Sequence, residues 1–190
     1  MEDLLSTHRR LLERFRKSMN LVGPGDLDLH YADCAGALSV LEPAGTWADL
    51  GSGAGFPGIP FAARFPEVAL DLVDSRQKRC VFLEHVLAEG RASGLAPVRV
   101  VCRRIEDLAP GYDGVLARAL APPPAVLAHA ARLLRPGGRV LLMMQRDQPL
   151  PEDPRFEVLV EHPYRAGGKE RRVVLARRRP PGPAGEARSG

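Results

Sequence analysis

The feature that most constrains this chain is a glycine-rich turn over residues 49–58, which reads Asp-Leu-Gly-Ser-Gly-Ala-Gly-Phe-Pro-Gly. An apolar approach, Thr46-Trp47-Ala48, leads into the turn, and an apolar stretch with helical potential follows it. Glycine suits such a turn because a Cβ would block the approach of a ligand to the backbone, and because some positions can require a positive φ. The start of the following helix offers unpaired backbone N–H groups. The stretch therefore predicts a buried strand that turns sharply into a helix over a bound nucleoside.

Two classes of ligand compete for this turn. Gly53-x-Gly55-x-x-Gly58 has the spacing of the dinucleotide fingerprint, and Asp74 lies at about the expected acidic distance downstream. The carboxylate of Asp49 would repel a pyrophosphate, whereas it suits a ligand that carries an ammonium and a sulfonium group. Asp-x-Gly-x-Gly-x-Gly is typical of loops that bind S-adenosylmethionine. A nicotinamide dinucleotide and a tight turn without a ligand stay open as alternatives.

The composition is that of one globular domain. A chain of 190 residues, 45% hydrophobic and 26% charged, is long enough to bury a core of its own. No apolar run approaches the roughly 20 residues that cross a bilayer, and the N-terminus, Met1-Glu2-Asp3, is acidic where a signal peptide would be basic. These features predict a cytoplasmic protein without a membrane partner.

The cysteines and the charge narrow the function classes further. Cys34, Cys80 and Cys102 are odd in number and far apart, so we expect reduced, mostly buried thiols and no metal site. The net charge of +4 is compatible with a nucleic-acid partner. Part of the excess lies in residues 177–179 and at Arg188, so the charge alone does not establish such a partner.

Two helices are predicted ahead of the turn. Residues 3–19 carry apolar side chains at helical spacing between arginines, which predicts an amphipathic helix. Those arginines either face RNA or form a solvated helix face. Residues 29–41 form a second short helix in which His30 and Asp33 lie one turn apart. A lone His–Asp pair of this kind is usually structural.

From residue 46 onward, strand-like runs alternate with helical segments, which is typical of a parallel sheet with helices on both faces. The predicted strands and helices are, in turn, strands 46–50, 69–74, 98–102, 112–117 and 139–144 and helices 57–64, 77–89 and 124–134. The inner side of helix 77–89 is predicted to carry Val81, Phe82, His85 and Val86.

The last part of the chain has a different pattern. Runs 156–161 and 171–177, joined by Ala166-Gly167-Gly168, predict a hairpin. A terminal antiparallel pair on a parallel sheet is expected of an α/β class I methyltransferase with a seven-stranded, Rossmann-like sheet, and not of a dinucleotide dehydrogenase. The predicted organisation is an N-terminal helical extension over residues 1–45, a methyltransferase domain over 46–178 and a disordered tail over 179–190.

In open α/β sheets a ligand lies beyond the carboxyl ends of the strands, where this chain places several charged residues. Asp74 is placed to accept both hydroxyls of a ribose, with capping of the next helix as the alternative role. We expect Ile105 and Glu106 to flank an adenine, and Asp49 to lie near the sulfonium and amino-acid end of the ligand. Arg118 ends the fourth strand and faces the acceptor side.

Taken together, these motifs closely resemble those of the bacterial 16S ribosomal RNA guanine-N7 methyltransferase G family, also called glucose-inhibited division protein B. The most specific match is the glycine turn with its Phe-Pro-Gly extension, residues 49–60. The further matches are Leu72-Val-Asp-Ser75, Lys78-Arg79, Phe82-Leu-Glu84, Asn20-Leu21, His30 with Asp33, Arg104-Ile-Glu106, Ala117-Arg118-Ala119, Pro136-Gly-Gly-Arg139 and Glu170-Arg171. The resemblance covers about residues 11–178.

The resemblance implies a class I fold, S-adenosylmethionine as the methyl donor, and a guanine of 16S ribosomal RNA in the small subunit as the acceptor, with the chain acting as a monomer. The residues predicted to bind the cofactor are Asp49, Gly51, Gly53, Gly55, Phe56, Asp74, Ile105, Glu106 and Arg118. Guanine N7 already has a lone pair, so catalysis needs positioning and electrostatics rather than a general base. Arg118 is the catalytic candidate, and Arg139 and Arg171 are weaker candidates for holding the RNA.

Two departures from the family pattern concern the substrate. Met143-Met144-Gln145 stands where the family usually has Leu-Lys-Gly, and residues 146–155 are too short and proline-rich for the usual helix. Loss of a basic residue beside the site weakens RNA binding before it weakens cofactor binding. A divergent relative that binds cofactor or RNA without turnover, or that methylates another substrate, is therefore the alternative hypothesis.

Overall fold

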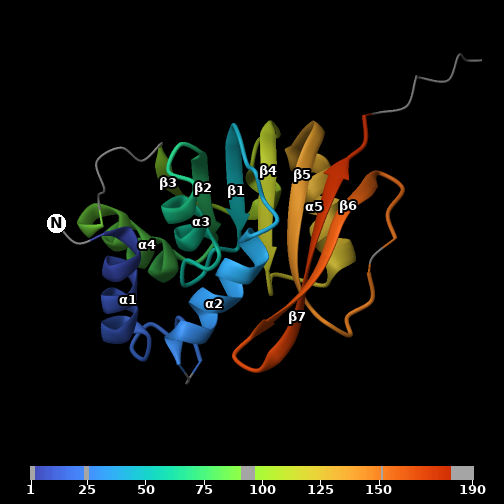
Figure 1. Cartoon of the computed structure of the whole chain (residues 1–190). Coiled ribbons are helices and arrows are strands. Elements are labelled where there is room, and N and C mark those ends of the chain that lie inside the picture. Colours follow the sequence, from blue (N-terminus) through green and yellow to red (C-terminus); the bar gives the residue numbers. More distant parts are fainter. Residues whose placement is uncertain (1–2, 24–25, 91–96, 151, 181–190) are drawn as a thin grey trace, which may run out of the picture.

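The computed structural model describes residues 3–23, 26–90, 97–150 and 152–180, which contain one seven-stranded sheet in the order β3-β2-β1-β4-β5-β7-β6 (Figure 1). The strands are β1 Thr46–Leu50, β2 Ala69–Asp74, β3 Val98–Cys102, β4 Tyr112–Arg118, β5 Leu134–Gln145, β6 Phe156–Ala166 and β7 Lys169–Arg178. Strands β1 to β5 run parallel, and β7 pairs antiparallel with both β5 and β6. The predicted class I methyltransferase fold with its terminal hairpin is confirmed. The predicted tail lies outside the described residues from 181 onward.

The helices cover the two faces of the sheet unequally. They are α1 Leu4–Phe15, α2 Leu27–Leu38, α3 Gly58–Arg64, α4 Gln77–Glu89 and α5 Pro123–Leu133, with a short 3-10 helix η1 at Ile105–Asp107. Figure 1 shows α1 to α4 on one face and α5 on the other. The described residues of the β5–β6 connection, 146–150 and 152–155, contain no helix, as the short proline-rich stretch predicts. No helix within the described ranges is long and apolar enough to cross a membrane.

The core has two layers because successive strand side chains point to opposite faces of a sheet. In β1, Trp47 is buried in the cluster formed with α1 to α4, and Ala48 in the cluster formed with α5. Leu11, Leu12 and Leu38 of the N-terminal helices belong to the first cluster. The N-terminal helices therefore pack onto the same core as the sheet.

Two sequence predictions about local structure were wrong. Val81 and His85 of α4 are exposed, and Cys80 and Leu83 are buried in their place, because α4 turns a slightly different face to the sheet. The fifth strand begins at Leu134 and not at the predicted residue 139, so residues 135–138 lie inside β5, where the pairing with β4 shifts register between Tyr112 and Gly114.

Gly114 of β4 permits the close packing of Trp47 from the neighbouring strand. A Cβ at this position would lie 2.3 Å from the indole ring. We expect Gly114→Ala to lower the free energy of unfolding by about 1–3 kcal/mol, the usual cost of overpacking a core. Urea denaturation measures this, with Gly23→Ala as the control because a Cβ at Gly23 meets no atom within 4 Å. Equal unfolding midpoints for the two variants would contradict this account of the packing.

Candidate active site

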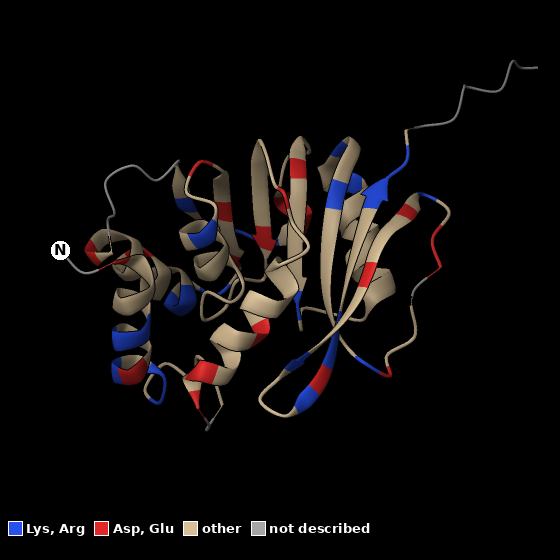
Figure 2. Ribbon diagram, in the orientation of Figure 1, with Lys and Arg blue, Asp and Glu red and all other residues tan. Residues whose placement is uncertain are grey.

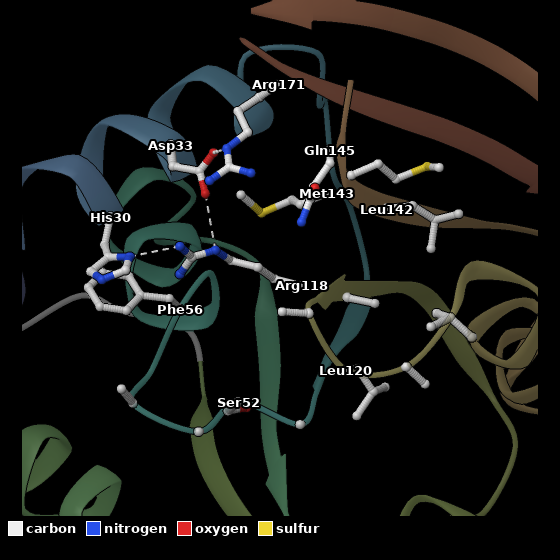
Figure 3. Close-up of a pocket in the computed structure, with 18 of the residues that line it drawn as sticks. His30, Asp33, Ser52, Phe56, Arg118, Leu120, Leu142, Met143, Gln145 and Arg171 are labelled. Atoms are coloured by element: carbon white, nitrogen blue, oxygen red, sulfur yellow. Dashed lines mark hydrogen bonds and ion pairs between the residues drawn. The ribbon is translucent and has the colours of Figure 1, made fainter. Parts of the chain in front are cut away.

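A pocket of about 710 Å³ lies at the carboxyl ends of β1, β4 and β5. Its wall is formed by the glycine turn after β1, one face of α2, the loop after β4, the end of β5 and the turn end of the β6–β7 hairpin (Figure 3). The predicted position of a ligand in an open α/β sheet is thus the position of this pocket.

The glycine turn has the backbone conformation that its sequence requires. Gly51, Gly53 and Gly55 have φ values of 73°, 57° and 93°, all in the left-handed region that favours glycine. A Cβ on Gly51 would lie 2.6 Å from Leu120 Cδ1, on the side of the loop after β4. A Cβ on Gly58 would lie 2.5 Å from Asp49 Oδ2. A side chain at Gly51 or Gly58 would therefore come too close to Leu120 or to Asp49, respectively.

Asp49 is buried beneath the turn with half of its carboxylate unpartnered. The residue is 1% exposed, and Oδ2 accepts a hydrogen bond from the N–H of Gly58 at 3.0 Å. Oδ1 is buried and has no hydrogen-bond partner among the described residues. Burial raises the pKa of Asp49 to about 7. A buried oxygen of this kind favours a ligand that brings a positive charge or a hydrogen-bond donor.

Asp74 at the end of β2 ties the turn to the next helix. Its Oδ2 accepts from the N–H of Gly53 at 2.9 Å, and its Oδ1 accepts from the N–H of Arg76 at 2.9 Å. The guanidinium of Arg79, which lines the pocket, also reaches Oδ2 at 3.3 Å. The carboxylate thus fixes the glycine turn and holds the backbone of Arg76, the residue before α4, rather than an N–H inside the helix as the predicted capping role would require.

The nine residues predicted to bind the cofactor fall into three groups. Those that line the pocket are Gly51, Gly53, Phe56 and Arg118. Asp49, Gly55 and Asp74 lie within or beneath the turn, without lining the pocket. Ile105 and Glu106 lie on η1, and the Glu106 side chain is 64% exposed, with the ring of His129 at 3.7 Å. The structure does not bring these last two beside the turn.

Arg118, the predicted catalytic residue, points into the pocket from the end of β4 (Figure 3). Its Nε donates to Asp33 Oδ2 at 3.1 Å, and its Nη2 lies 2.8 Å from His30 Nδ1. The guanidinium lies over the ring of Phe56, 5.5 Å from the ring centre. The side chain is 19% exposed, so the charge is partly desolvated yet accessible from the pocket.

Asp33 is the centre of this group of charges. Its Oδ1 accepts from the hydroxyl of Tyr164 at 2.9 Å and lies 3.8 Å from Nε of Arg171. Burial, together with the positive charge of Arg118, lowers the pKa of His30, so the ring is neutral at pH 7 and its Nδ1 accepts the guanidinium N–H. One carboxylate therefore faces two guanidinium groups, and a positive charge remains beside the pocket.

Sequence reasoning missed most of this cluster. It interpreted His30 and Asp33 as a structural pair and did not single out Tyr164, although the family motifs that include His30, Asp33 and Arg171 carried the signal. Arg139, the other weak candidate, lies in the middle of β5 and does not line the pocket; it donates to the carbonyl of Glu42 and lies over the ring of Trp47.

Comparison with known proteins places the chain in a family. A family model described as rRNA small subunit methyltransferase G matches residues 1–157. Among relatives of that name, the chain is 36% identical over 149 residues to the protein of Paracoccus denitrificans, covering 75% of this chain and 76% of the relative. It is 44% identical over 144 residues to that of Rhodospirillum centenum, covering 72% of this chain and 63% of the relative.

Solved structures agree on the fold. The magnesium protoporphyrin IX methyltransferase of Synechocystis aligns with a TM-score of 0.60 at 15% identity, over 90% of this chain and 97% of the other. The 16S rRNA N2 G1207 methyltransferase of Thermus thermophilus aligns with a TM-score of 0.52 at 22% identity, over 86% of this chain and 44% of the other. With the family match over most of its length, the chain belongs to the rRNA small subunit methyltransferase G family.

Proposed function

We propose that this chain transfers a methyl group from S-adenosylmethionine to N7 of a guanine in 16S ribosomal RNA. The observation that carries the proposal is that one pocket joins a left-handed glycine turn over a half-unpartnered Asp49 with the positively charged cluster around Arg118. Family membership supports the class of substrate. We propose that the chain acts in the cytoplasm, where small ribosomal subunits assemble. We also propose that it acts as a monomer.

The residues present fit the methyl donor. The turn offers a wall free of side chains at Gly51 and Gly53, and Asp49 offers a buried oxygen for the donor's amino-acid end. Contact of Asp74 with both hydroxyls of a ribose requires Arg79 to release Oδ2, which also accepts from the N–H of Gly53. We propose that Ile105 and Glu106 flank the adenine of the donor, although neither side chain lines the pocket.

The chain's own task is to position the acceptor. When bound, S-adenosylmethionine supplies an electrophilic methyl group on its sulfonium. Because guanine N7 carries a lone pair and no proton, no side chain has to remove a proton before N7 attacks the methyl group and the thioether leaves, and placing the base in line with the methyl group is the main requirement. Asp33 and His30 hold one side of the Arg118 guanidinium, which leaves its remaining N–H groups to hold the base or a phosphate.

The charge distribution favours a nucleic-acid acceptor. Figure 2 shows Lys and Arg, interspersed with Asp and Glu, at the lower end of α1 and near the tip of the β6–β7 hairpin, and the hairpin also contributes Tyr164 and Arg171 to the pocket. Arg14, Lys17, Arg165 and Lys169 are exposed there. Such side chains bind phosphates irrespective of base sequence.

The position of the lysine absent from this chain also lies at the pocket. Met144, which stands at that position, is uncharged and is buried in the core cluster formed with α5. It therefore offers no positive charge to the acceptor. Its neighbour Gln145 pairs in the sheet register with Arg171. We infer that Arg171 supplies the positive charge at this edge of the pocket.

Methyl transfer with labelled S-adenosylmethionine tests the proposal. The acceptors are small ribosomal subunits from a strain that lacks its own enzyme of this family, the deproteinised RNA of those subunits, and bovine serum albumin. We expect label in 7-methylguanosine of the small-subunit RNA with wild type and none with Asp49→Ala. Cofactor binding without any transfer would indicate a binding protein, and label in another nucleoside or in protein would indicate another acceptor. Binding of a nicotinamide dinucleotide in place of S-adenosylmethionine would overturn the interpretation of the turn.

A further inference from the structure

His8 of α1 reaches the glycine turn from outside the pocket. The residue is 0% exposed, and its Nε2 lies 2.6 Å from the carbonyl oxygen of Ala54, in the middle of the turn. Its Nδ1 lies 2.8 Å from the hydroxyl of Tyr31 on α2. Both ring nitrogens are therefore engaged, one with the turn and one with the second N-terminal helix.

The partners of His8 determine which nitrogen carries the proton. Burial lowers the pKa of His8 to about 4, so the ring is neutral at physiological pH and holds one proton. The carbonyl of Ala54 can only accept, which requires the proton on Nε2. Nδ1 is then an acceptor, and the Tyr31 hydroxyl donates to it. Without that hydroxyl, Nδ1 would lose its donor, and this tautomer would lose one of the two hydrogen bonds that stabilise it.

The contact with His8 falls on the carbonyl that lies between two glycines of the turn. Ala54 lines the pocket and stands between two glycines in the left-handed region, Gly53 and Gly55. A Cβ on Gly55 would lie 2.8 Å from His8 Nε2, so the imidazole packs directly against this glycine. Glycine backbone loses more conformational freedom on ordering than any other residue. A buried hydrogen bond at Ala54 therefore reduces the ordering that a ligand would otherwise impose.

The same ring also supports the pocket wall. The ring centre of Phe56 lies 5.0 Å from that of His8 and 5.0 Å from that of Tyr31, each in an edge-on arrangement. On its other side Phe56 lies beneath the guanidinium of Arg118. The His8–Tyr31 pair thus contacts both the turn and the aromatic platform under the acceptor cluster.

We propose that His8 is a positioning residue for the methyl donor: anchored by the Tyr31 hydroxyl, it fixes the Ala54 peptide and so pre-forms the glycine turn for S-adenosylmethionine. The inference rests on the proposed function and deepens it, because it assigns the two N-terminal helices a role in donor affinity. His8 itself does not touch the donor.

Three variants separate the hydrogen bonds from the packing. His8→Phe keeps a ring of similar shape and removes both hydrogen bonds. His8→Gln keeps a donor near the position of Nε2. Tyr31→Phe removes only the hydroxyl that donates to Nδ1. We expect the dissociation constant for S-adenosylmethionine to rise about tenfold in His8→Phe and about threefold in Tyr31→Phe, the loss of a buried hydrogen bond. His8→Gln should bind at least threefold tighter than His8→Phe.

Calorimetry at pH 7.5 measures the affinities, and thermal unfolding measures stability alongside. Gly114→Ala is the matched control, because it is destabilised through Trp47 without changing a residue of the turn or of the pocket lining, and it should keep the wild-type affinity. Wild-type affinity in a folded His8→Phe, or in Tyr31→Phe if His8→Phe does not fold, would overturn the inference and leave the proposed function intact. Failure of the wild type to bind S-adenosylmethionine would overturn both.

Discussion

Replacement of Asp49 by asparagine is expected to weaken S-adenosylmethionine binding about 100-fold or more, the scale seen when one partner of a buried charge pair is removed. The variant keeps the shape of the side chain and an oxygen for the N–H of Gly58, and loses the charge at Oδ1. Calorimetry measures the change. Asp71→Asn is the control, because Asp71 is also buried but is held by Arg99 and Tyr112, away from the pocket. Affinity within threefold of wild type in Asp49→Asn would contradict the assigned role.

The same substitution has an opposite effect on stability. Because the folded pKa of Asp49 is about 7 and the unfolded value is 3.8, the folded protein holds this proton more tightly. Asp49 therefore destabilises the fold progressively as pH rises from about 4 to about 7, by a few kcal/mol at most. We expect Asp49→Asn to gain stability relative to wild type between pH 5 and pH 8.

Comparison of the two proteins at each pH isolates Asp49 from other groups. His8, whose pKa is lowered to about 4 in the fold, works in the opposite direction, since stability is lost as pH falls below about 6.5 toward 4. That contribution is present in both proteins and cancels in the difference. Urea denaturation at pH 5 and pH 8 measures the free energy of unfolding of each protein. If the difference in this free energy between Asp49→Asn and wild type were the same at both pH values, the raised pKa would be contradicted.

Replacement of Arg118 by lysine is expected to lower kcat/KM for the RNA acceptor about 100-fold or more, the effect of losing one pre-positioned electrostatic donor. Lysine keeps the charge but cannot donate to Asp33 and His30 in a fixed fork while facing the pocket. The affinity for S-adenosylmethionine should change less than the RNA parameter, because the turn and Asp49 stay in place.

Arg139→Lys is the matched control for this effect, since Arg139 lies within β5, outside the pocket lining, and donates to the carbonyl of Glu42. Methyl transfer at the wild-type rate by Arg118→Lys would remove Arg118 from the catalytic role. A loss explained wholly by weaker donor binding would leave it as a cofactor-binding residue only.

Local sequence signals account for most of the fold. The strand bounds of β1, β2 and β3 and the bounds of α4 match their predictions, because apolar runs, glycines and acidic strand ends all lie close together in the chain. The buried face of α4 was harder to predict than its bounds, since Val81 and His85 each lie one position away from a buried residue. A small rotation of a helix exchanges such neighbours without changing the periodicity.

The site was less predictable because it assembles residues that are far apart in sequence. Arg118 and His30 are 88 positions apart, and Tyr164 and Asp33 are 131 apart. No periodicity relates such pairs, so a local interpretation of His30 and Asp33 as structural was reasonable and incomplete. The sequence did not predict a role for His8, because a histidine among leucines on an amphipathic helix is usually interpreted as a core residue.

A single-turnover experiment tests the central claim most directly. The chain is loaded with labelled S-adenosylmethionine and mixed with an excess of small ribosomal subunits that lack the methyl group, and the RNA is digested to nucleosides. The account predicts 7-methylguanosine in an amount equal to the loaded enzyme, and almost none when Arg118→Lys is loaded to the same extent. Label that remains on the donor, or that appears in a different nucleoside, would contradict it.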